Sequence, residues 1–405
     1  MTLIREDADR CVLCGMCLPH CPTYGLTRSE AESPRGRIAL MLALAKAELE
    51  PTPELRAHLD NCLSCRACER MCPSRVPYGR LLTHTRALLA DRGEAPAPER
   101  LMNRLLDGSA RVQRTARSAF RVYEKSGVQT LVRHFAPAGG RLRRLDDLLP
   151  ALPPSRPLPK PAAAGGEPRG RVALFTGCTG ELFDLPTLKA TVRLLGALGY
   201  GVDVPPAQTC CGARHRSSGR LDLAREQATA NLTAFAEANA VVSIASGCGA
   251  TLGEYGEWVD GGEALSEAVY DVSDFLARCE WPATLRFQPL DAPVAVHIPC
   301  SLRNVLRGEQ VPYRLLERIP GIKLLPLAHN ETCCGAAGSY MLEHPETAEA
   351  LREPKITALA QSGARYLVSS NIGCALHLAA GARRAGIEVE VLHPVVLLER
   401  QLVSS

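Results

Sequence analysis

Two stretches of the chain share one arrangement of cysteines: CVLCGMCLPHCP at residues 11–22 and CLSCRACERMCP at residues 62–73. Each follows the pattern C-x2-C-x2-C-x3-C-P without a departure at any position. The short gaps let three thiolates wrap around one small metal centre, and the proline then turns the chain away. Cysteines grouped in this way indicate metal or redox chemistry rather than disulfide bonds.

The spacing is typical of bacterial ferredoxins with two [4Fe-4S] clusters, in which the fourth cysteine of each motif ligates the other cluster. We therefore expect two ligand sets: Cys11, Cys14, Cys17 and Cys72 for one cluster, and Cys62, Cys65, Cys68 and Cys21 for the other. The alternative is a pair of zinc sites, which also use four thiolates but usually pair two C-x2-C knuckles across a longer gap. His20, beside Cys21, is expected to be a surface residue.

Composition limits the remaining possibilities. The chain has 405 residues, of which 46% are hydrophobic and 22% charged, so it can bury a core and is not wholly disordered. A net charge of +4 and only 4% aromatic residues argue against nucleic acid as a partner. The 17 cysteines, with no apolar leader in MTLIREDADRC and no long apolar run, predict a cytoplasmic protein that contacts a membrane at most peripherally.

The chain divides into four parts on this reading. Residues 1–90 are expected to form an α-helical, ferredoxin-like domain around the two cysteine motifs. Residues 91–170 read as a basic helical region followed by a linker rich in proline, alanine and glycine. The basic region is either a solvated amphipathic linker or a docking surface for a partner subunit or an anionic membrane. Residues 171–291 and 292–405 form the remaining two parts.

These last two parts repeat each other. Four features recur in the same order, namely an apolar run ending in cysteine (171–178 and 292–300), a Cys-Cys-Gly (210–212 and 333–335), a second such run (240–248 and 364–374) and a closing apolar stretch (269–276 and 389–398). The offset is 122 residues at the first cysteine, 123 at the pair and 126 at the third. A nearly constant offset predicts two tandem copies of one module.

Each copy is expected to be an α/β unit. Apolar strand-like runs alternate with helical patterns such as 185–198 and 221–239, which favours a parallel sheet with right-handed crossovers. The single cysteines would then follow the carboxyl ends of strands, the edge at which ligands bind in open α/β sheets. The predicted binding residues are Cys178, Cys210, Cys211 and Cys248 in the first module, and Cys300, Cys333, Cys334 and Cys374 in the second.

Three interpretations of these eight cysteines stay open: buried structural thiols, a structural zinc site, or an iron–sulfur or other redox site in at least one module. A matched set in both copies argues against structural thiols alone. Cys279 lies outside both patterns and is expected to take no part.

The duplicated Cys…Cys-Cys-Gly…Cys pattern resembles the "CCG" domains of heterodisulfide reductase and its relatives. With two ferredoxin motifs in front, with SPRGRI at 33–38 and NIGCALHL at 371–378, the whole arrangement is similar to the iron–sulfur subunits of bacterial glycolate oxidase (glycolate dehydrogenase). The resemblance implies that flavoprotein partner subunits oxidise glycolate to glyoxylate and that this subunit passes the electrons onward, towards a membrane quinone. The chain has no G-x-G-x-x-G signature, which agrees with a flavin elsewhere.

One departure from that resemblance concerns the end of each CCG motif. In heterodisulfide reductase the motif ends in C-x-x-C and offers a fifth thiolate, whereas Thr251 and His377 stand at that position here. His377 is kept as a candidate ligand, and Thr251 is a poor one. The missing cysteine argues against an enzyme that works by itself at a CCG site. Related subunits serve lactate or glycerol-3-phosphate oxidation, which leaves a second choice of substrate.

Overall fold

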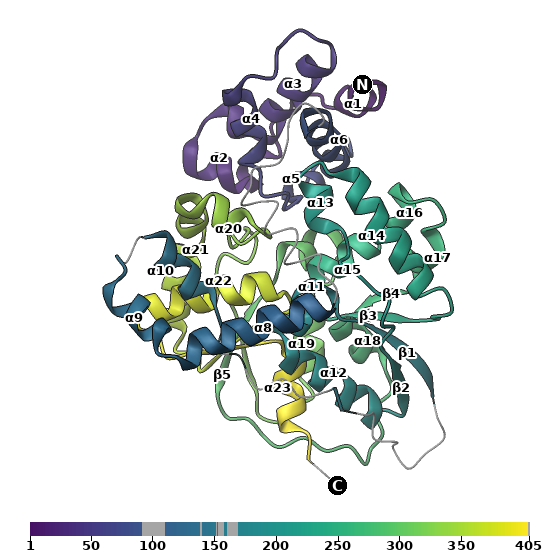
Figure 1. Cartoon of the computed structure of the whole chain (residues 1–405), viewed down its shortest axis with the longest axis vertical. Coiled ribbons are helices and arrows are strands. Elements are labelled where there is room, and N and C mark those ends of the chain that lie inside the picture. Colours follow the sequence, from purple (N-terminus) through teal and green to yellow (C-terminus); the bar gives the residue numbers. More distant parts are fainter. Residues whose placement is uncertain (91–109, 138–139, 151, 153–157, 160–168, 404–405) are drawn as a thin grey trace.

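A computed structural model of the chain describes residues 1–90, 110–137, 140–150, 152, 158–159 and 169–403. It confirms a helical N-terminal region followed by two parallel four-stranded sheets. In Figure 1 the N-terminal domain lies at one end of the molecule, next to the two α/β modules. None of the helices in the described part of the chain combines the length and the apolar character needed to cross a membrane.

The N-terminal domain is a small helical unit with its own core. Its elements are α1 (Thr2–Ala8), η1 (Leu18–His20), α2 (Pro22–Thr27), η2 (Glu30–Glu32), α3 (Pro34–Ala45), α4 (Pro53–Asp60), α5 (Ala67–Arg70) and α6 (Tyr78–Ala90). Helix α3 begins where Ser33 Oγ accepts a 2.9 Å hydrogen bond from Gly36 N, with Pro34 in the first turn. Met41, Leu59 and Leu81 are fully buried between the longer helices. This core holds the two cysteine loops in place.

Three helices follow: α8 (Ala110–Lys125), α9 (Val128–Phe135) and α10 (Arg141–Leu148). They pack on both modules, since Arg117 Nη1 donates to Glu181 O at 2.6 Å and Arg384 Nε donates to Asp147 Oδ2 at 2.6 Å. The helical expectation therefore holds for this part, which lies across the modules and does not merely link domains. Residues 91–109 and most of the proline-rich stretch lie outside the described residues.

The two sheets have the same strand order. The first contains β1 (Gly170–Phe175), β2 (Tyr200–Asp203), β3 (Val241–Ser243) and β4 (Val269–Asp271), ordered β2-β1-β3-β4. The second contains β5 (Pro293–His297), β6 (Lys323–Pro326), β7 (Tyr366–Ser369) and β8 (Glu390–Leu392), ordered β6-β5-β7-β8. All neighbouring strands in both sheets are parallel. The repeat in the sequence is thus a repeat in structure.

Helices connect the strands in both modules. The first module has α11 (Gly177–Phe183), α12 (Leu185–Ala197), α13 (Ala213–Ser217), α14 (Leu221–Ala234), α15 (Ser246–Leu252), α16 (Tyr255–Trp258), α17 (Glu263–Ala268) and α18 (Val272–Arg278). The second has the π-helix η3 (Ser301–Val305), α19 (Val311–Leu316), α20 (Tyr340–Glu343), α21 (Pro345–Ser362), α22 (Ile372–Arg384) and α23 (Pro394–Gln401).

The correspondence extends to single side chains. Gln208 Oε1 accepts a 2.8 Å hydrogen bond from Thr176 N, just after β1. In the second module Asn330 Oδ1 accepts a 3.0 Å hydrogen bond from Ile298 N, just after β5. Each pair lies 122 residues from its counterpart. Because both amides fix the chain at the same point, the two loops that follow these strands leave the sheets in the same way.

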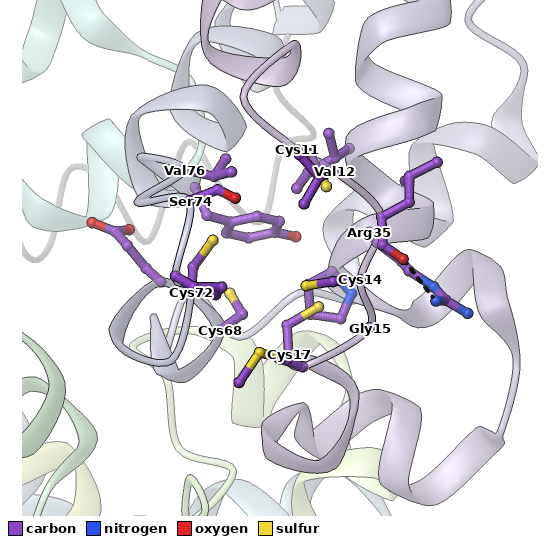
Figure 2. A pocket seen from close by; sticks show the side chains of 17 residues that line it. Cys11, Val12, Cys14, Gly15, Cys17, Arg35, Cys68, Cys72, Ser74 and Val76 are labelled. Carbon is purple, nitrogen blue, oxygen red and sulfur yellow. Dashed lines mark hydrogen bonds between the residues drawn. The ribbon is translucent and has the colours of Figure 1, made fainter.

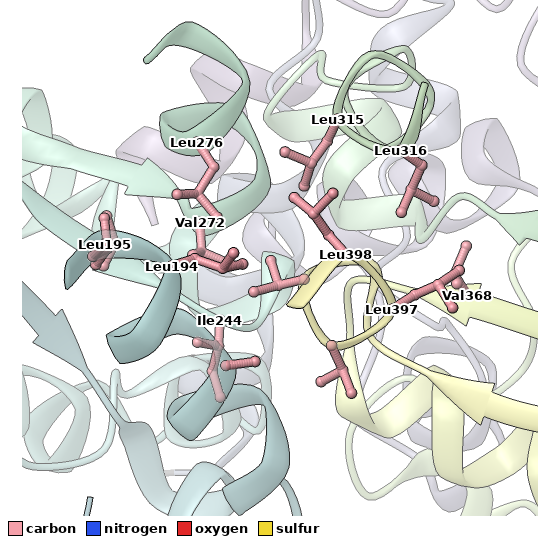
Figure 3. Close-up of a cluster of buried hydrophobic side chains, with 14 of the residues drawn as sticks. Leu194, Leu195, Ile244, Val272, Leu276, Leu315, Leu316, Val368, Leu397 and Leu398 are labelled. Carbon is pink, nitrogen blue, oxygen red and sulfur yellow. The ribbon is translucent and has the colours of Figure 1, made fainter. Parts of the chain in front are cut away.

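The modules share one hydrophobic core. Figure 3 shows Leu194 and Leu276 of the first module facing Leu315 and Leu398 of the second. Successive residues of a strand point to opposite faces, so only one face of each sheet contributes to this core. Burial of each leucine favours the folded state by about 2 kcal/mol, which makes a shared core a strong reason for the modules to stay together. The other face of each sheet carries the CCG cysteines.

Candidate metal centres

The two cysteine loops of the N-terminal domain have the same backbone shape. Leu13 and Gly15 have positive φ angles of 57° and 80°, and the matching residues of the second loop, Ser64 and Arg66, have 51° and 57°. A left-handed conformation costs a non-glycine residue roughly 1–2 kcal/mol, so it persists only where its surroundings fix it. Backbones that alternate in this way direct successive N–H groups to one point and form anion-binding concavities.

The first loop and the end of the second motif line one pocket. Figure 2 shows the sulfur atoms of these residues turned towards a common space. The cysteines that line it are Cys11, Cys14, Cys17, Cys68 and Cys72. Both Cys68 and Cys72 therefore lie beside the three cysteines of the other motif, and crossed ligation by Cys72 stays a prediction. Burial raises the pKa of Cys17 to about 11, so this thiol keeps its proton unless a metal replaces it.

The cysteines of the second set also lie close to one another. Burial raises the pKa of Cys68 well above its usual value, and the nearby thiols of Cys65, Cys62 and Cys21 raise it further. Burial also raises the pKa of Cys65 well above its usual value, and the nearby thiols of Cys300, Cys62 and Cys21 raise it further. The proximity of Cys21 to the second motif is the counterpart of Cys72 beside the first. Buried thiols at this density fit the ligands of a metal centre, whose charge compensates the loss of protons.

A buried arginine stands beside the second set. Arg37 is 1% exposed, and its Nη1 donates to Thr23 Oγ1 at 3.0 Å and to the carbonyl of Glu32 at 2.6 Å. Burial alone would lower its pKa, but the charges of Cys62, Glu32 and Cys21 outweigh that effect and raise it. The guanidinium is a fixed positive charge next to the cysteines that we expect to bind a metal centre. It belongs to the SPRGRI segment.

The CCG cysteines of the first module lie where the strands of its sheet end. Cys178 is in the first turn of α11 and Cys248 is in the first turn of α15, so both lie at helix N-termini, which favour thiolates. Cys210 and Cys211 are buried between them. Hydrogen bonds with Cys210 and Cys248 raise the pKa of Cys211 well above its usual value. The predicted clustering at one edge of the sheet is present.

Side chains of the first module hold the backbone of its cysteine pair. Asn231, fully buried in α14, donates from Nδ2 to the carbonyl of Cys210 at 3.0 Å. The hydroxyl of Tyr255 donates to the carbonyl of Cys211 at 2.9 Å. Both carbonyls are thereby paired with protein donors, which leaves the sulfur atoms to face the site.

The second module brings its four cysteines together with a histidine. Cys300 Sγ lies 4.0 Å from Cys333 Sγ. The ligand atoms of His297, Cys334 and Cys374 all lie within 4.8 Å of one another, and all three residues are buried. Hydrogen bonds from Cys333 and Cys374, together with His297, hold the pKa of Cys334 well below its usual value. Such a set can bind a transition metal.

A buried lysine distinguishes the second module further. Lys355 is 0% exposed in α21, its Nζ donates to the carbonyl of His329, and its charge acts on Cys334. Burial lowers the pKa of this ammonium group. The first module has the neutral Asn231 at the corresponding turn of α14. The two sites therefore differ in charge although their cysteines match.

The prediction for His377 meets a different environment. Its Nε2 lies 3.1 Å from the carbonyl of Ala348, and its Nδ1 lies 3.4 Å from Arg352 Nη1. These contacts engage both ring nitrogens, so this geometry leaves no lone pair for a metal. Thr251 bonds the carbonyl of Gly247 at 3.1 Å, and Cys279 Sγ donates to the carbonyl of Phe275 at 3.2 Å. Both of these side chains are therefore engaged with the backbone of their own helix.

Sequence reasoning missed His297 and Lys355. The signal for His297 was present in the aligned runs RVALFTGC and APVAVHIPC, where Phe175 and His297 occupy the same position. A histidine before the first cysteine of only one copy marks a chemical difference between two otherwise matched sites. Lys355 had no comparable signal, since an exposed and a buried lysine on a helix look alike in a sequence.

Comparisons with known proteins agree with the geometry. A family model described as "4Fe-4S dicluster domain" matches residues 7–76, and one described as "Cysteine-rich domain" (CCG) matches residues 172–253 and 294–379. The first contains both N-terminal motifs. The two matches of the second contain all eight CCG cysteines.

Three curated relatives show how far the likeness extends. The chain is 34% identical to the "Probable glycolate oxidase iron-sulfur subunit" of Bacillus subtilis (strain 168), over 96% of this chain and 92% of the relative. It is 33% identical to the "Glycolate oxidase iron-sulfur subunit" of Escherichia coli (strain K12), over 97% and 93%. It is 31% identical to "Lactate utilization protein A" of Geobacillus thermodenitrificans (strain NG80-2), over 57% and 99%. The chain therefore belongs to the family of glycolate oxidase iron–sulfur subunits, with one 4Fe-4S dicluster domain and two CCG domains.

Proposed function

We propose that this chain is the electron-transfer subunit of a flavin-dependent glycolate dehydrogenase, which converts glycolate to glyoxylate. Membership of the family supports an iron–sulfur subunit of an oxidoreductase, and two nearly full-length relatives carry the glycolate oxidase name. The substrate-oxidising flavin belongs, in this proposal, to partner subunits. The downstream acceptor is a membrane quinone.

The observation that carries the proposal is the pair of cysteine sets in the N-terminal domain. We assign Cys11, Cys14, Cys17 and Cys72 to one [4Fe-4S] cluster, and Cys62, Cys65, Cys68 and Cys21 to the other. Such a cluster, when bound, takes up and releases one electron at a time. In the second set Cys21 is buried and the other three cysteines are partly buried, whereas Cys14 of the first set is exposed to a partner.

The contact between the N-terminal domain and the second module supports transfer within the chain. Cys65 and Cys300 pack against the same buried cluster of side chains, which includes Leu63 and Cys333. Arg70 of α5 forms a 2.6 Å ion pair with Glu309 at the edge of this contact. One ligand set therefore adjoins the CCG cysteines of the second module.

A partner surface is proposed for the helices α8, α9 and α10. They leave Val122, Leu131 and Phe135 exposed, with Phe135 at 74%. Arg133 and Arg143 lie on the same helices. An apolar face bordered by arginines supports docking of the flavoprotein partner or contact with an anionic membrane.

The test uses the whole chain, purified without oxygen and combined with its flavoprotein partner. We expect about eight iron atoms with acid-labile sulfide in the N-terminal domain, as two four-iron clusters require. Cys14→Ser or Cys65→Ser should abolish electron flow to a downstream dye, while glycolate still reduces the partner flavin. Cys279→Ser is the matched control and should change neither iron content nor dye reduction.

Two results would contradict the proposal. Zinc without acid-labile sulfide would remove the electron-carrying role. Unchanged dye reduction in both cysteine variants would do the same. The lactate utilization relatives, matched over 57% of this chain, make lactate the second candidate substrate. Flavin reduction by lactate and not by glycolate would decide for it.

A further inference from the structure

The side chain of His297 lies on the cysteine face of its sheet. In strand β5, Val294 and Val296 belong to the core that the two modules share, whereas Ala295 belongs to the core that contains Cys334. Side chains alternate along a strand, so His297 shares the face of Ala295. The final residue of this strand is therefore aimed at the site.

One nitrogen of His297 is held and the other is free. Its Nδ1 lies 3.0 Å from Ser369 Oγ, on the strand that pairs with β5. Its Nε2 is buried, since the residue is 1% exposed, and forms no hydrogen bond of normal geometry within the described residues; the sulfur of Cys334 is close enough to act on the imidazole. A neutral imidazole that donates from Nδ1 to Ser369 keeps the lone pair of Nε2 for a ligand, the usual arrangement of a metal-binding histidine.

The neighbours of His297 are the sulfur atoms of the site. Its ligand atom and those of Cys334 and Cys374 lie within 4.8 Å of one another. Bonds of 2.0–2.1 Å to nitrogen and about 2.3 Å to sulfur place the donors of one tetrahedral metal roughly 3.5 Å apart, a span that these atoms need only small rotations to reach. Imidazole and thiolate together select iron or zinc over hard cations.

We infer that His297 Nε2 is a metal ligand in the second module, beside the thiolates of Cys334 and Cys374, and that the matching position of the first module, Phe175, provides no ligand. The metal is a transition metal of the class that thiolates and imidazole share, either iron of a cluster or Zn²⁺. The inference rests on the metal-binding part of the proposed function. It assigns to His297 the additional ligand that the sequence suggested for His377.

The first module provides the natural comparison. Phe175 stands 122 residues before His297 and pairs with Ser243 as His297 pairs with Ser369. Its ring packs on Phe235, with centroids 6.0 Å apart. The hydroxyl of Ser243 donates instead to the carbonyl of Ala245 at 3.1 Å. At this position the first module offers a hydrocarbon ring where the second offers a nitrogen donor.

The difference has a chemical consequence. Neutral imidazole in place of an anionic thiolate leaves a metal centre less negative, which favours its reduced state. Lys355 adds a buried ammonium group on the same side. Where the metal is iron of a cluster, the second module, which adjoins Cys65, should accept an electron more readily than a site bound by thiolates alone.

The test compares the whole wild-type chain with three variants, His297→Phe, His297→Cys and His377→Thr, all labelled with ¹⁵N-histidine and purified without oxygen. Each of two variants introduces the residue of the first module: Phe175 is the counterpart of His297, and Thr251 is the counterpart of His377. Metal analysis first shows whether the second module holds iron or zinc. Pulsed EPR of the reduced protein then detects histidine nitrogen bound to iron, and X-ray absorption at the zinc edge detects it on zinc.

We expect one bound histidine nitrogen in the wild type and in His377→Thr, and none in His297→Phe or His297→Cys. His297→Cys replaces the donor by a thiolate, so it should keep its metal even if His297→Phe fails to fold. A nitrogen signal that survives in His297→Cys, an all-sulfur wild type, or a second module without metal would overturn the inference. Failure of the proposed function is separate, because it appears as loss of N-terminal iron or of dye reduction.

Discussion

Asn304 Nδ2 donates a 2.7 Å hydrogen bond to the carbonyl oxygen of Cys65. Asn304 is buried in η3 of the second module, and Cys65 is in the second cysteine loop of the N-terminal domain. The bond therefore ties a loop of one domain to a helix of another, at the place where Cys65 and Cys300 come together. The position of this loop depends on a residue 239 places away in the sequence.

Asn304→Ala should loosen the second cysteine loop and leave the first unchanged. The substitution leaves the partly buried carbonyl of Cys65 without this partner, a loss of about 1–3 kcal/mol. We expect faster amide hydrogen exchange in residues 62–68, measured by mass spectrometry on the anaerobically purified chain. Residues 11–17 form a loop of the same shape and serve as the internal control. An equal change in both loops, or none in either, would contradict the role of this bond.

Arg37→Met should strongly destabilise the N-terminal domain. Arg37 and Glu32 form a buried ion pair, and removing one partner of such a pair costs about 3–5 kcal/mol because the other charge stays buried. The control is Arg35→Met, which breaks the partly exposed pair with Glu30 and should cost less than about 1 kcal/mol. Chemical unfolding of both variants measures the difference. Adding Glu32→Gln to Arg37→Met should recover part of the loss; similar costs for the two single variants would refute the prediction.

Asp271 should make the chain less stable as pH rises from 4 to 8. Its Oδ1 accepts a 2.8 Å bond from Ser273 N at the start of α18, and burial raises its pKa from 3.8 to about 7. The folded state therefore binds the proton more tightly than the unfolded state, and ionisation destabilises it by up to about 4 kcal/mol. Asp271→Asn keeps the acceptor at the helix start and cannot ionise. In unfolding experiments, the free energy of unfolding of Asp271→Asn should exceed that of the wild type by more at pH 8 than at pH 5.5.

His393 holds the matching position in the second module and should act in the opposite direction. Its Nδ1 accepts a 3.1 Å bond from Val395 N at the start of α23, and burial lowers its pKa from 6.5 to about 3. The unfolded state binds the proton more tightly, so stability falls as pH decreases from 6.5 to 3. His393→Asn should make the free energy of unfolding fall less between pH 6.5 and pH 3, while leaving it little changed above pH 7. A steeper acid limb in the variant would show that His393 is not the group responsible.

Gly335→Ala should be more damaging than Gly212→Ala, although both glycines end a Cys-Cys-Gly. Gly335 has φ +90° and a Cβ there would lie 2.5 Å from the carbonyl oxygen of Ala348, whereas a Cβ at Gly212 would lie 3.2 Å from that of Ala224. We expect Gly335→Ala to lower the free energy of unfolding by more than about 3 kcal/mol, and Gly212→Ala to lower it by about 1–2 kcal/mol. Gly363→Ala, at φ +61° with open space around it, isolates the cost of the backbone angle. Equal losses in all three variants would exclude the steric explanation.

Several features could be predicted from the sequence because they depend on short-range spacing or on repetition. The helical N-terminal region and the two parallel sheets are present, and each CCG cysteine set lies at the edge where strands end. Cysteine gaps of two and three residues constrain a loop directly, whatever the rest of the chain does. A repeat of four features at a constant offset requires the same topology twice, and the register of β1 and β5 shows how closely it is kept.

Other features depended on folding. His377 stood three residues after a cysteine in the sequence, yet Arg352 and Ala348 of another helix engage both of its nitrogens. His297 attracted no attention in the sequence, yet strand alternation and pairing with Ser369 direct it towards Cys334.

By itself, the sequence determined which cysteines share a loop, because bonds along the chain limit how far neighbouring cysteines can separate. Only the tertiary structure decided which histidine faces the second site and which domain adjoins it. Those outcomes depend on contacts between residues far apart in the chain, such as Asn304 and Cys65, and no local spacing encodes them.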